Sequence, residues 1–292
     1  MDDIRQTAID RFQAYLERRQ FSAHTVASYT LDLRLFFAEV PVPLALVSFR
    51  EVDQCVERQH QHHRAWATIN RRLNALKHFF DFCVDQQLVA GNPIQPSHFV
   101  RRGRPLPKAL SREQVQRLFA HIDHPMDRAL FLVMLRCGLR VSEVAALKLA
   151  HIDWEQQALL IEQGKGRKDR RVYLSPDAVA SLQQCLGQHP GDHAQGYVVW
   201  NRKCHQQPLS VKAIQKKMER YAKAAAVPAS CHSLRHTFAS NLLEHGAEVV
   251  VIRDFLGHSQ IASSERYAKV SSQKIKHEYL RTMQKILQQG QV

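Results

Sequence analysis

The stretch CHSLRHTFASNLLEHG, residues 231–246, lies in the second half of this 292-residue chain and is the starting point for inferring its fold. Its apolar side chains recur at the spacing of one helix face, and Gly246 ends the pattern. His232 and Arg235 stand one turn apart where the helix begins, so both side chains can point toward one ligand. The alternative for His232 is an imidazole that only caps the helix. The stretch predicts an amphipathic helix with a polar pair at its start.

Apolar patterns on both sides of this helix predict a mainly helical second part with one small antiparallel β-sheet. The nearly continuous apolar run at 131–139 favours a buried helix over a strand, because helical patterning precedes it. Short apolar runs at 158–161 and 172–174 flank the basic stretch 164–171, which predicts a β-hairpin with a basic turn. Apolar residues at helical spacing over 275–287 predict a C-terminal helix.

The first hundred residues form a separate helical domain by pattern. Apolar side chains over 26–37 predict a helix capped by Ser22, and those over 69–84 predict a second helix. Residues 101–108 combine two prolines with a basic run and show no apolar periodicity, as expected of an extended linker. The linker divides the chain into domains at 1–100 and 109–292.

The charge of the chain predicts a polyanionic partner. Net charge is +14 and the sequence pI is about 9.8. Residues 1–100 hold as many acidic as basic side chains, so the excess lies in the linker and the second domain. Nucleic acid and an anionic membrane surface both suit such a charge. A basic surface that only keeps the protein soluble is the third possibility.

One face of the predicted helix at 69–84 has the side chains of a DNA contact. Its polar residues are Arg71, Arg72, Asn74 and Lys77. Arginine and asparagine contact phosphates and base edges in a DNA groove. An ordinary solvated helix face would show the same pattern.

Cysteines, histidines and hydropathy indicate a cytosolic protein without a bound metal. The six cysteines are scattered without a Cys-x-x-Cys pair, so we expect reduced thiols and no zinc cluster. His60, His62 and His63 lack carboxylate or cysteine partners at ligand spacing, and we expect a solvated connection there. No apolar stretch approaches the roughly 20 residues of a membrane span, and residues 1–5 lack the pattern of a signal peptide.

Several polar residues of the second part could hold a phosphodiester for attack by Tyr267. Two arginines, Arg140 and Arg235, are a natural clamp, because guanidinium presents a planar, permanently charged fork to phosphate oxygens. Arg140 alone would more often pair with Glu143 at the surface. A tyrosine, whose ordinary pKa is about 10, needs nearby positive charge and a base before it can attack.

Phosphodiester cleavage also needs an acid for the leaving alkoxide. Lys165 suits this task, because it lies between two glycines in the basic turn, where the backbone can approach the DNA. No acidic cluster suited to Mg²⁺ accompanies these residues. Metal-free transesterification is therefore the hypothesis.

Four motifs in fixed order resemble the tyrosine recombinases, and in particular the short Xer-like members of that family. They are GLRVSE at 138–143, GKGRKDR at 164–170, HSLRHTFA at 232–239, and LGHS at 256–259 followed by Tyr267. The first domain is similar to the helical, SAM-like core-binding domain of the family. The resemblance covers nearly the whole chain.

The resemblance implies a role for each matching residue. Arg140 and Arg235 would bind the phosphate, Lys165 would be the general acid, His232 the proton acceptor, His258 the histidine of the second motif, Tyr267 the nucleophile, and Glu143 a supporting carboxylate. Further DNA contacts are expected from basic residues of the linker and the hairpin turn: Arg101, Arg102, Arg104, Arg167, Lys168 and Arg170.

The resemblance also implies a mechanism and an assembly. A 3′-phosphotyrosyl link forms, the freed 5′-hydroxyl attacks a partner strand, and a Holliday junction is resolved without metal, ATP or another cofactor. The two domains would close as a clamp on double-stranded DNA that carries a specific site, in a homotetramer. The C-terminal helix would dock on a neighbouring subunit; folding back on its own domain is the alternative.

The biological role and two other activities stay open at this point. Residues 263–269, SSERYAK, depart from the paired threonines usual near the tyrosine of Xer proteins, so a plasmid, phage, transposon or chromosome could be the target. A second recombinase or an accessory DNA-bending protein would be compatible. A type IB topoisomerase and a non-catalytic DNA-binding regulator on the same fold are the rival functions. We expect a cytoplasmic, nucleoid-associated protein.

Overall fold

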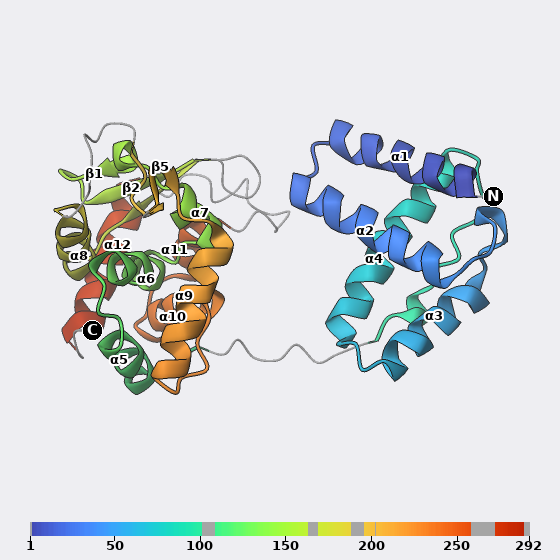
Figure 1. Cartoon of the computed structure of the whole chain (residues 1–292). Helices are drawn as coiled ribbons and strands as arrows, with labels where there is room; N and C mark the ends of the chain where they lie inside the picture. Colours follow the sequence, from blue (N-terminus) through green and yellow to red (C-terminus); the bar gives the residue numbers. More distant parts are fainter. Residues whose placement is uncertain are drawn as a thin grey trace. The chain divides into compact units, whose positions relative to one another are not determined.

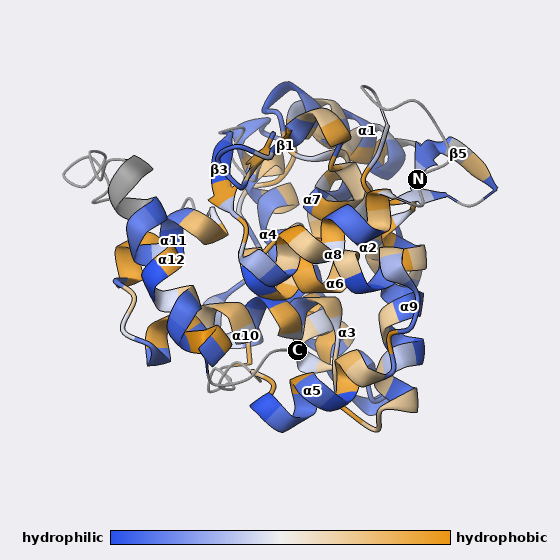
Figure 2. Ribbon diagram, turned by 90° about the vertical axis from the view of Figure 1, so that its left-hand side faces the viewer, coloured by the Kyte–Doolittle hydropathy of each residue, from blue (hydrophilic) through white to orange (hydrophobic). Residues whose placement is uncertain are grey.

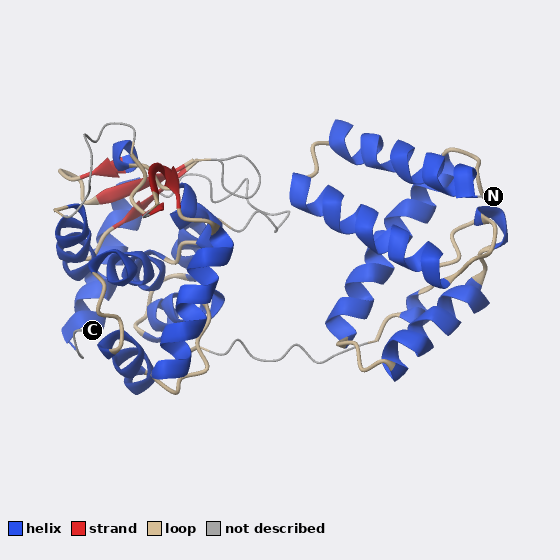
Figure 3. Cartoon of the chain, in the orientation of Figure 1, coloured by secondary structure: helices blue, strands red, loops and turns tan. Residues whose placement is uncertain are grey.

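The computed structural model describes residues 2–100, 109–162, 169–187, 196–201, 203–257 and 272–288. The chain forms two compact units, Met1–Arg104 and Pro105–Val292. Both units are mainly helical, and the described strands all belong to the second one (Figures 1 and 3). The predicted fold class, mainly α with a small antiparallel sheet in the second domain, is confirmed.

The first unit is built from four helices around an aromatic core. These are α1 (Asp2–Arg18), α2 (Ala23–Glu39), α3 (Phe49–Gln61) and α4 (Trp66–Asp85), with 3-10 turns at Leu44–Leu46 and Pro96–His98. The Ser22 hydroxyl caps α2 by accepting a hydrogen bond from the Thr25 backbone. Phe12 of α1 meets Phe79 of α4 edge to face, with ring centroids 5.4 Å apart. The helices predicted at 26–37 and 69–84 are α2 and α4.

The solvated connection expected around residues 60–63 is present at His62 and His63, which are exposed in the turn that follows α3. His60 lies within α3, and its ring stacks on Trp66 at a centroid distance of 4.3 Å. The buried residues of α3 are only Val52, Cys55 and Gln59, so its apolar stripe is too thin to read from sequence.

The second unit contains the remaining elements. In chain order these are α5 (Arg112–Ala120), α6 (Pro125–Cys137), α7 (Val141–Ala146), a 3-10 turn at Leu149–His151, β1 (Ile152–Asp153), β2 (Ala158–Ile161), β3 (Arg170–Tyr173), α8 (Pro176–Leu186), β4 (Trp200–Asn201), β5 (Cys204–Pro208), α9 (Val211–Ala224), α10 (Cys231–Glu244), α11 (Val249–Leu256) and α12 (Ser272–Gln288). No helix among these described residues, or in the described first unit, is long and apolar enough to cross a membrane.

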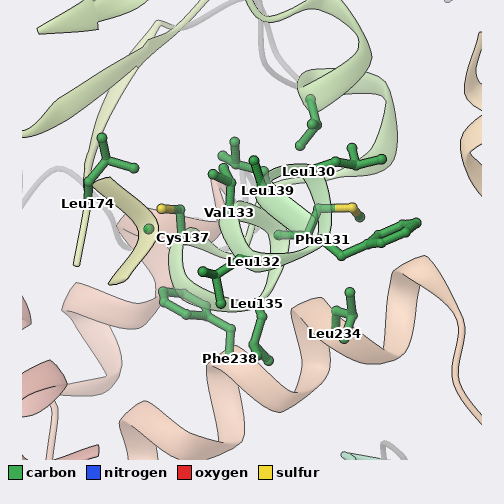
Figure 4. Packing of buried hydrophobic residues seen from close by; sticks show 14 of the residues in the cluster. Leu130, Phe131, Leu132, Val133, Leu135, Cys137, Leu139, Leu174, Leu234 and Phe238 are labelled. Carbon is green, nitrogen blue, oxygen red and sulfur yellow. The ribbon is translucent and has the colours of Figure 1, made fainter. Parts of the chain in front are cut away.

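Helix α6 is the centre of the second unit. Eleven of its residues, from Met126 to Cys137, are buried, and Figure 2 colours most of the helix as hydrophobic. Leu234 and Phe238 of α10 pack against it near Leu135 (Figure 4). The predictions of a buried helix at 131–139 and an amphipathic helix at 231–246 are thus confirmed, and the two helices are direct neighbours.

The predicted hairpin is present as β2 and β3. The strands pair antiparallel, from Ala158 opposite Tyr173 to Ile161 opposite Arg170. β1 adds a short third strand beside β2, and β4 and β5 form a separate pair that sequence patterns did not indicate. Because Arg170 and Arg171 are consecutive in β3, their side chains leave the sheet on opposite faces.

Helix α12 packs on its own unit, which is the alternative to docking on a neighbouring subunit. Tyr279 is fully buried and stacks on Phe255 at 5.0 Å. Its hydroxyl donates a 3.1 Å hydrogen bond to the carbonyl of Arg136 in α6. Met283 and Ile286 are buried on the same side, so in the single chain the helix completes the core of the unit.

Candidate phosphate-binding site

A glycine corner after α6 places Arg140. Gly138 takes the left-handed conformation, with φ of 65°, and ends the helix. The chain then turns, and Arg140 becomes the N-cap residue of α7. Its backbone N–H and its Nη1 each donate a 2.7 Å hydrogen bond to Glu143, one turn further along. The ion pair expected for an isolated Arg140 is therefore present, and about a quarter of the side chain stays exposed.

Arg235 is fixed from α10 by two main-chain carbonyls. The helix begins at Cys231, where the Ser230 hydroxyl accepts from the Ser233 backbone. Arg235 lies one turn in and is 5% exposed. Its Nη1 donates to the carbonyl of Gly138, and its Nη2 donates to the carbonyl of Leu256. The guanidinium is thus held by the corner that also directs Arg140.

Glu143 lies at the centre of three guanidinium groups. It accepts hydrogen bonds from Arg140 and from Arg170 in β3, and its carboxylate is 4.0 Å from Arg235. Burial raises the pKa of Glu143, but the hydrogen bonds from Arg170 and Arg140 outweigh burial and leave the pKa below its ordinary value. The carboxylate is therefore charged at neutral pH.

The site keeps a positive balance that suits a phosphate. Burial, and then the charge of Arg140, lower the pKa of Arg235 to about 10, so it remains protonated at pH 7. Three guanidinium groups around one carboxylate leave an excess of positive charge. An anion that arrived beside Arg140 and Arg235 would relieve their mutual repulsion.

One surface hollow contains both the polar pair predicted from the sequence, His232 and Arg235, and the second arginine of the predicted phosphate clamp, Arg140. Arg140, His232 and Arg235 all line it, together with residues of α9. His232 is exposed at the hollow, and the ring of His236 meets its own edge to face at 4.3 Å. Desolvation of the ring, followed by the charges of His236, Arg235 and Arg140, lowers the pKa of His232. The imidazole is therefore neutral at pH 7 and free to accept a proton.

The same arginines hold the end of α11. Arg170 Nε donates to the carbonyl of Phe255 at 2.8 Å, Arg235 to that of Leu256, and Arg140 Nη2 to that of Gly257 at 3.4 Å. Three consecutive carbonyls at the end of the helix thus each accept a hydrogen bond from a guanidinium. His258 is the next residue in the chain.

The remaining predicted residues lie outside the described part of the chain. These are Lys165, His258 and Tyr267 of the catalytic set, and Arg101, Arg102, Arg104, Arg167 and Lys168 of the expected DNA contacts.

Two arginines predicted to contact DNA, Arg170 and Arg72, also pair with groups of the protein itself. The guanidinium of Arg170 is bound to Glu143 and Phe255, and its side chain is 11% exposed. Arg72 of α4 donates to Gln59 at 2.9 Å and is 18% exposed. Both guanidinium groups are thus partly buried and paired within the protein, and their contact with DNA stays a prediction.

The other three residues of α4 that were predicted to contact DNA face solvent. Arg71 forms a bidentate ion pair with Asp32, and 47% of its side chain remains exposed. Lys77 is 54% exposed and lies 3.6 Å from Asp81. Asn74 is exposed and donates to the carbonyl of Asn70.

Two residues of the hollow were not singled out by sequence reasoning. Gln215 and Glu219 are exposed, stand one turn apart on α9 and line the hollow beside His232. Their i, i+4 spacing, next to the buried Ile214 and Met218, can be seen in the sequence. The sequence does not indicate that this face of α9 lies beside the start of α10.

Comparisons with known proteins place the chain in a family. Residues 108–274 match the phage integrase family, and residues 9–87 match the phage integrase N-terminal SAM-like domain. Tyrosine recombinase XerC of Halalkalibacterium halodurans is 30% identical over 93% of this chain and 95% of its own length. Tyrosine recombinase XerD of Pseudomonas aeruginosa is 30% identical over 93% and 95%. The Tn1549 transposon integrase, solved in complex with circular intermediate DNA, shares the fold with a TM-score of 0.72 at 16% identity, over 93% of this chain and 98% of that one.

The chain belongs to the phage integrase family. The two relatives named above are Xer proteins, and this chain is a tyrosine recombinase that carries out site-specific DNA recombination.

Proposed function

We propose that this recombinase cleaves one DNA strand at a time through a phosphotyrosine at Tyr267, linked to the 3′ side of the nick. Arg140 and Arg235 bind the scissile phosphate, and His232 accepts the proton of the tyrosine. Lys165 protonates the 5′-oxygen as it leaves, and His258 supports the phosphate. The observation that carries the proposal is the shared hollow, in which Arg140, His232 and Arg235 meet above the carboxylate of Glu143.

The chemistry balances without an external energy source. The tyrosine oxygen forms a bond to phosphorus while the bond from phosphorus to the 5′-oxygen breaks, and the proton lost by the tyrosine is matched by one given to the 5′-hydroxyl. The released hydroxyl of one strand then attacks the phosphotyrosine of its partner. Two such rounds make and resolve a Holliday junction. The positive site supplies charge stabilisation, so neither metal nor ATP enters the steps.

The cognate partner in this proposal is double-stranded DNA with a specific recombination site, gripped by both units as a clamp. Arg71, Asn74 and Lys77 contact it from the first unit, and Arg101, Arg102, Arg104, Arg167 and Lys168 add phosphate contacts. A homotetramer on two paired sites, in the nucleoid of the cytoplasm, is the working assembly. Exchange of α12 between subunits would require its buried Tyr279 to leave the core described above.

The native chain is expected to form a covalent adduct on a nicked suicide substrate in EDTA. The nick lets the short strand carrying the 5′-hydroxyl diffuse away, so the adduct accumulates. Denaturing electrophoresis measures the adduct, and mass spectrometry of its peptides identifies the linked residue. Binding of the cognate site without any adduct would contradict the proposed mechanism, and so would a phosphate linked to another residue.

The rate of adduct formation is expected to fall at acidic pH because of His232. Its pKa lies below the ordinary 6.5, so the neutral acceptor persists to that pH and is lost as pH falls through the folded-state pKa. Below the folded-state pKa of His232, the rate of adduct formation at subsaturating DNA should drop about tenfold per pH unit. His232→Gln should cost roughly 10²- to 10⁴-fold and remove this acidic limb.

A second variant checks the assignment of the acidic limb. His236→Gln removes a charge that lowers the pKa of His232, so the limb should move to higher pH while the rate at neutral pH is kept. An acidic limb that stays in His232→Gln would assign it to another group.

A further inference from the structure

Each of the three guanidinium nitrogens of Arg170 donates a hydrogen bond inside the protein. Nε donates to the carbonyl of Phe255 at 2.8 Å, while Nη1 and Nη2 donate to the two oxygens of Glu143 at 2.9 Å each. The site that a Cβ on Gly257 would occupy is 3.3 Å from Arg170 Nη1, so the backbone at the end of α11 lies against the guanidinium. The side chain therefore bridges the carboxylate of Glu143 and the end of α11.

Glu143 depends on Arg170 for half of its hydrogen bonds. Its Oε1 accepts from Nη1 of Arg140 and from Nη1 of Arg170, and its Oε2 accepts from the Arg140 backbone and from Nη2 of Arg170. An ionised carboxylate has about four acceptor positions. All four are filled, so Arg140 and Arg170 together fix the orientation of the carboxylate.

We propose that Arg170 is a positioning residue for strand cleavage, which sets Arg140 through Glu143 and holds the end of α11 in place. The inference rests on the proposed function, because it assigns Arg170 to the cleavage step of that mechanism. Arg170 makes no contact with DNA in this role. It acts through the carboxylate and through the carbonyl of Phe255.

Lysine cannot replace arginine in this position. One ammonium group is a point donor on a flexible stem, whereas the guanidinium fork reaches both oxygens of Glu143 while Nε bonds a carbonyl on its other side. Arg170→Lys keeps the positive charge but loses the bridge. Displacement of a clamp by about 1 Å can cost about 10²-fold in rate.

Arg170→Lys is expected to slow adduct formation at saturating protein about 100-fold, while the Kd for cognate DNA stays within about twofold of the native value. The matched control is Arg171→Lys in the same strand, where the side chain is 50% exposed and 3.6 Å from Asp153. The control should cleave at the native rate. Intact DNA binding by Arg170→Lys also shows that the variant is folded.

A DNA contact would give the reverse result. Loss of a phosphate contact weakens binding and lowers the salt dependence of log K by about one unit, with near-native cleavage at saturation. That outcome for Arg170→Lys, in a protein whose native form makes the adduct, overturns the inference and leaves the proposed function standing. Absence of an adduct from the native protein would instead overturn the proposed function.

A double-mutant cycle tests whether Arg170 acts through Glu143. The effects of Arg170→Lys and Glu143→Gln on the cleavage rate should be far from additive, because each removes the same bridge. Additive losses would contradict the inference. If Arg170→Lys melts below the assay temperature, the same measurements are made in the cold with Arg170→Gln, whose amide can still donate to Glu143.

Discussion

Tyr267→Phe is expected to abolish the covalent adduct, with a loss of roughly 10⁴-fold or more in rate, while affinity for cognate DNA stays within about twofold of the native value. Phenylalanine keeps the ring and removes only the attacking oxygen. In the proposed mechanism the arginines of the hollow bind the phosphate without that oxygen, so DNA binding should be kept while cleavage is lost. Filter binding measures the first property and the suicide substrate measures the second.

Two other tyrosines of the second unit, Tyr221 and Tyr279, are poor candidates for the nucleophile. Tyr221 is buried and donates a 2.8 Å hydrogen bond to Asp127; burial and this carboxylate raise its pKa to about 12. Tyr279 of α12 is fully buried in the core of the unit. Tyr221→Phe is therefore the control, and it should form the adduct while losing about 1 kcal/mol of stability with its hydrogen bond. An adduct that survives Tyr267→Phe would transfer the role to another residue.

Gly138→Ala is expected to destabilise the second unit by roughly 2–4 kcal/mol. An added Cβ would lie 2.4 Å from Cδ1 and 2.7 Å from Cε1 of Phe238, and the backbone has φ of 65°. The left-handed conformation costs about 1 kcal/mol, and overpacking adds about 1–3 kcal/mol. The melting temperature should fall by roughly 5–15 °C. Because the Gly138 carbonyl anchors Arg235, cleavage should fall as well.

Two other glycines of the same unit separate the causes of this loss. Gly246 has φ of 84° with nothing within 4 Å of the added carbon, so Gly246→Ala should show only the conformational cost of about 1 kcal/mol. Gly187 has an ordinary φ of −61°, and an added Cβ would come no closer than 3.6 Å to another atom. Gly187→Ala should therefore change the free energy of unfolding very little. Equal losses at positions 138 and 246 in calorimetry of the full chain would show that Phe238 yields to the added carbon.

Much of the fold was predictable because its main elements have strong periodic patterns. The apolar run that became α6, the hairpin of β2 and β3, and the amphipathic α10 each combine a clear period with a glycine or a turn. Helix α3 escaped prediction because few of its side chains are buried. The two-residue strands β1 and β4 are too short to show a period.

The site was predictable in its residue types and less so in its contacts. Arg140, Arg235 and His232 do line one hollow, as their chemistry suggested. Arg170 and Arg171 are neighbours in a basic hairpin, and the alternation of side chains along a strand shows only that they point to opposite faces of the sheet. Which face meets Glu143 depends on how β3 lies against α7 and α11, and that packing is set by residues far away in sequence.

The three guanidinium groups on the last carbonyls of α11 make its position a single cooperative unit. The carbonyls of Phe255, Leu256 and Gly257 belong to one short rigid segment, so a shift by one residue would break all three bonds together. Loss of the segment would also leave the three arginines facing one another with only Glu143 between them. We therefore expect the three bonds to be lost together in any variant that displaces the end of α11, and the cleavage rate of such a variant to fall by more than the loss of one hydrogen bond would explain.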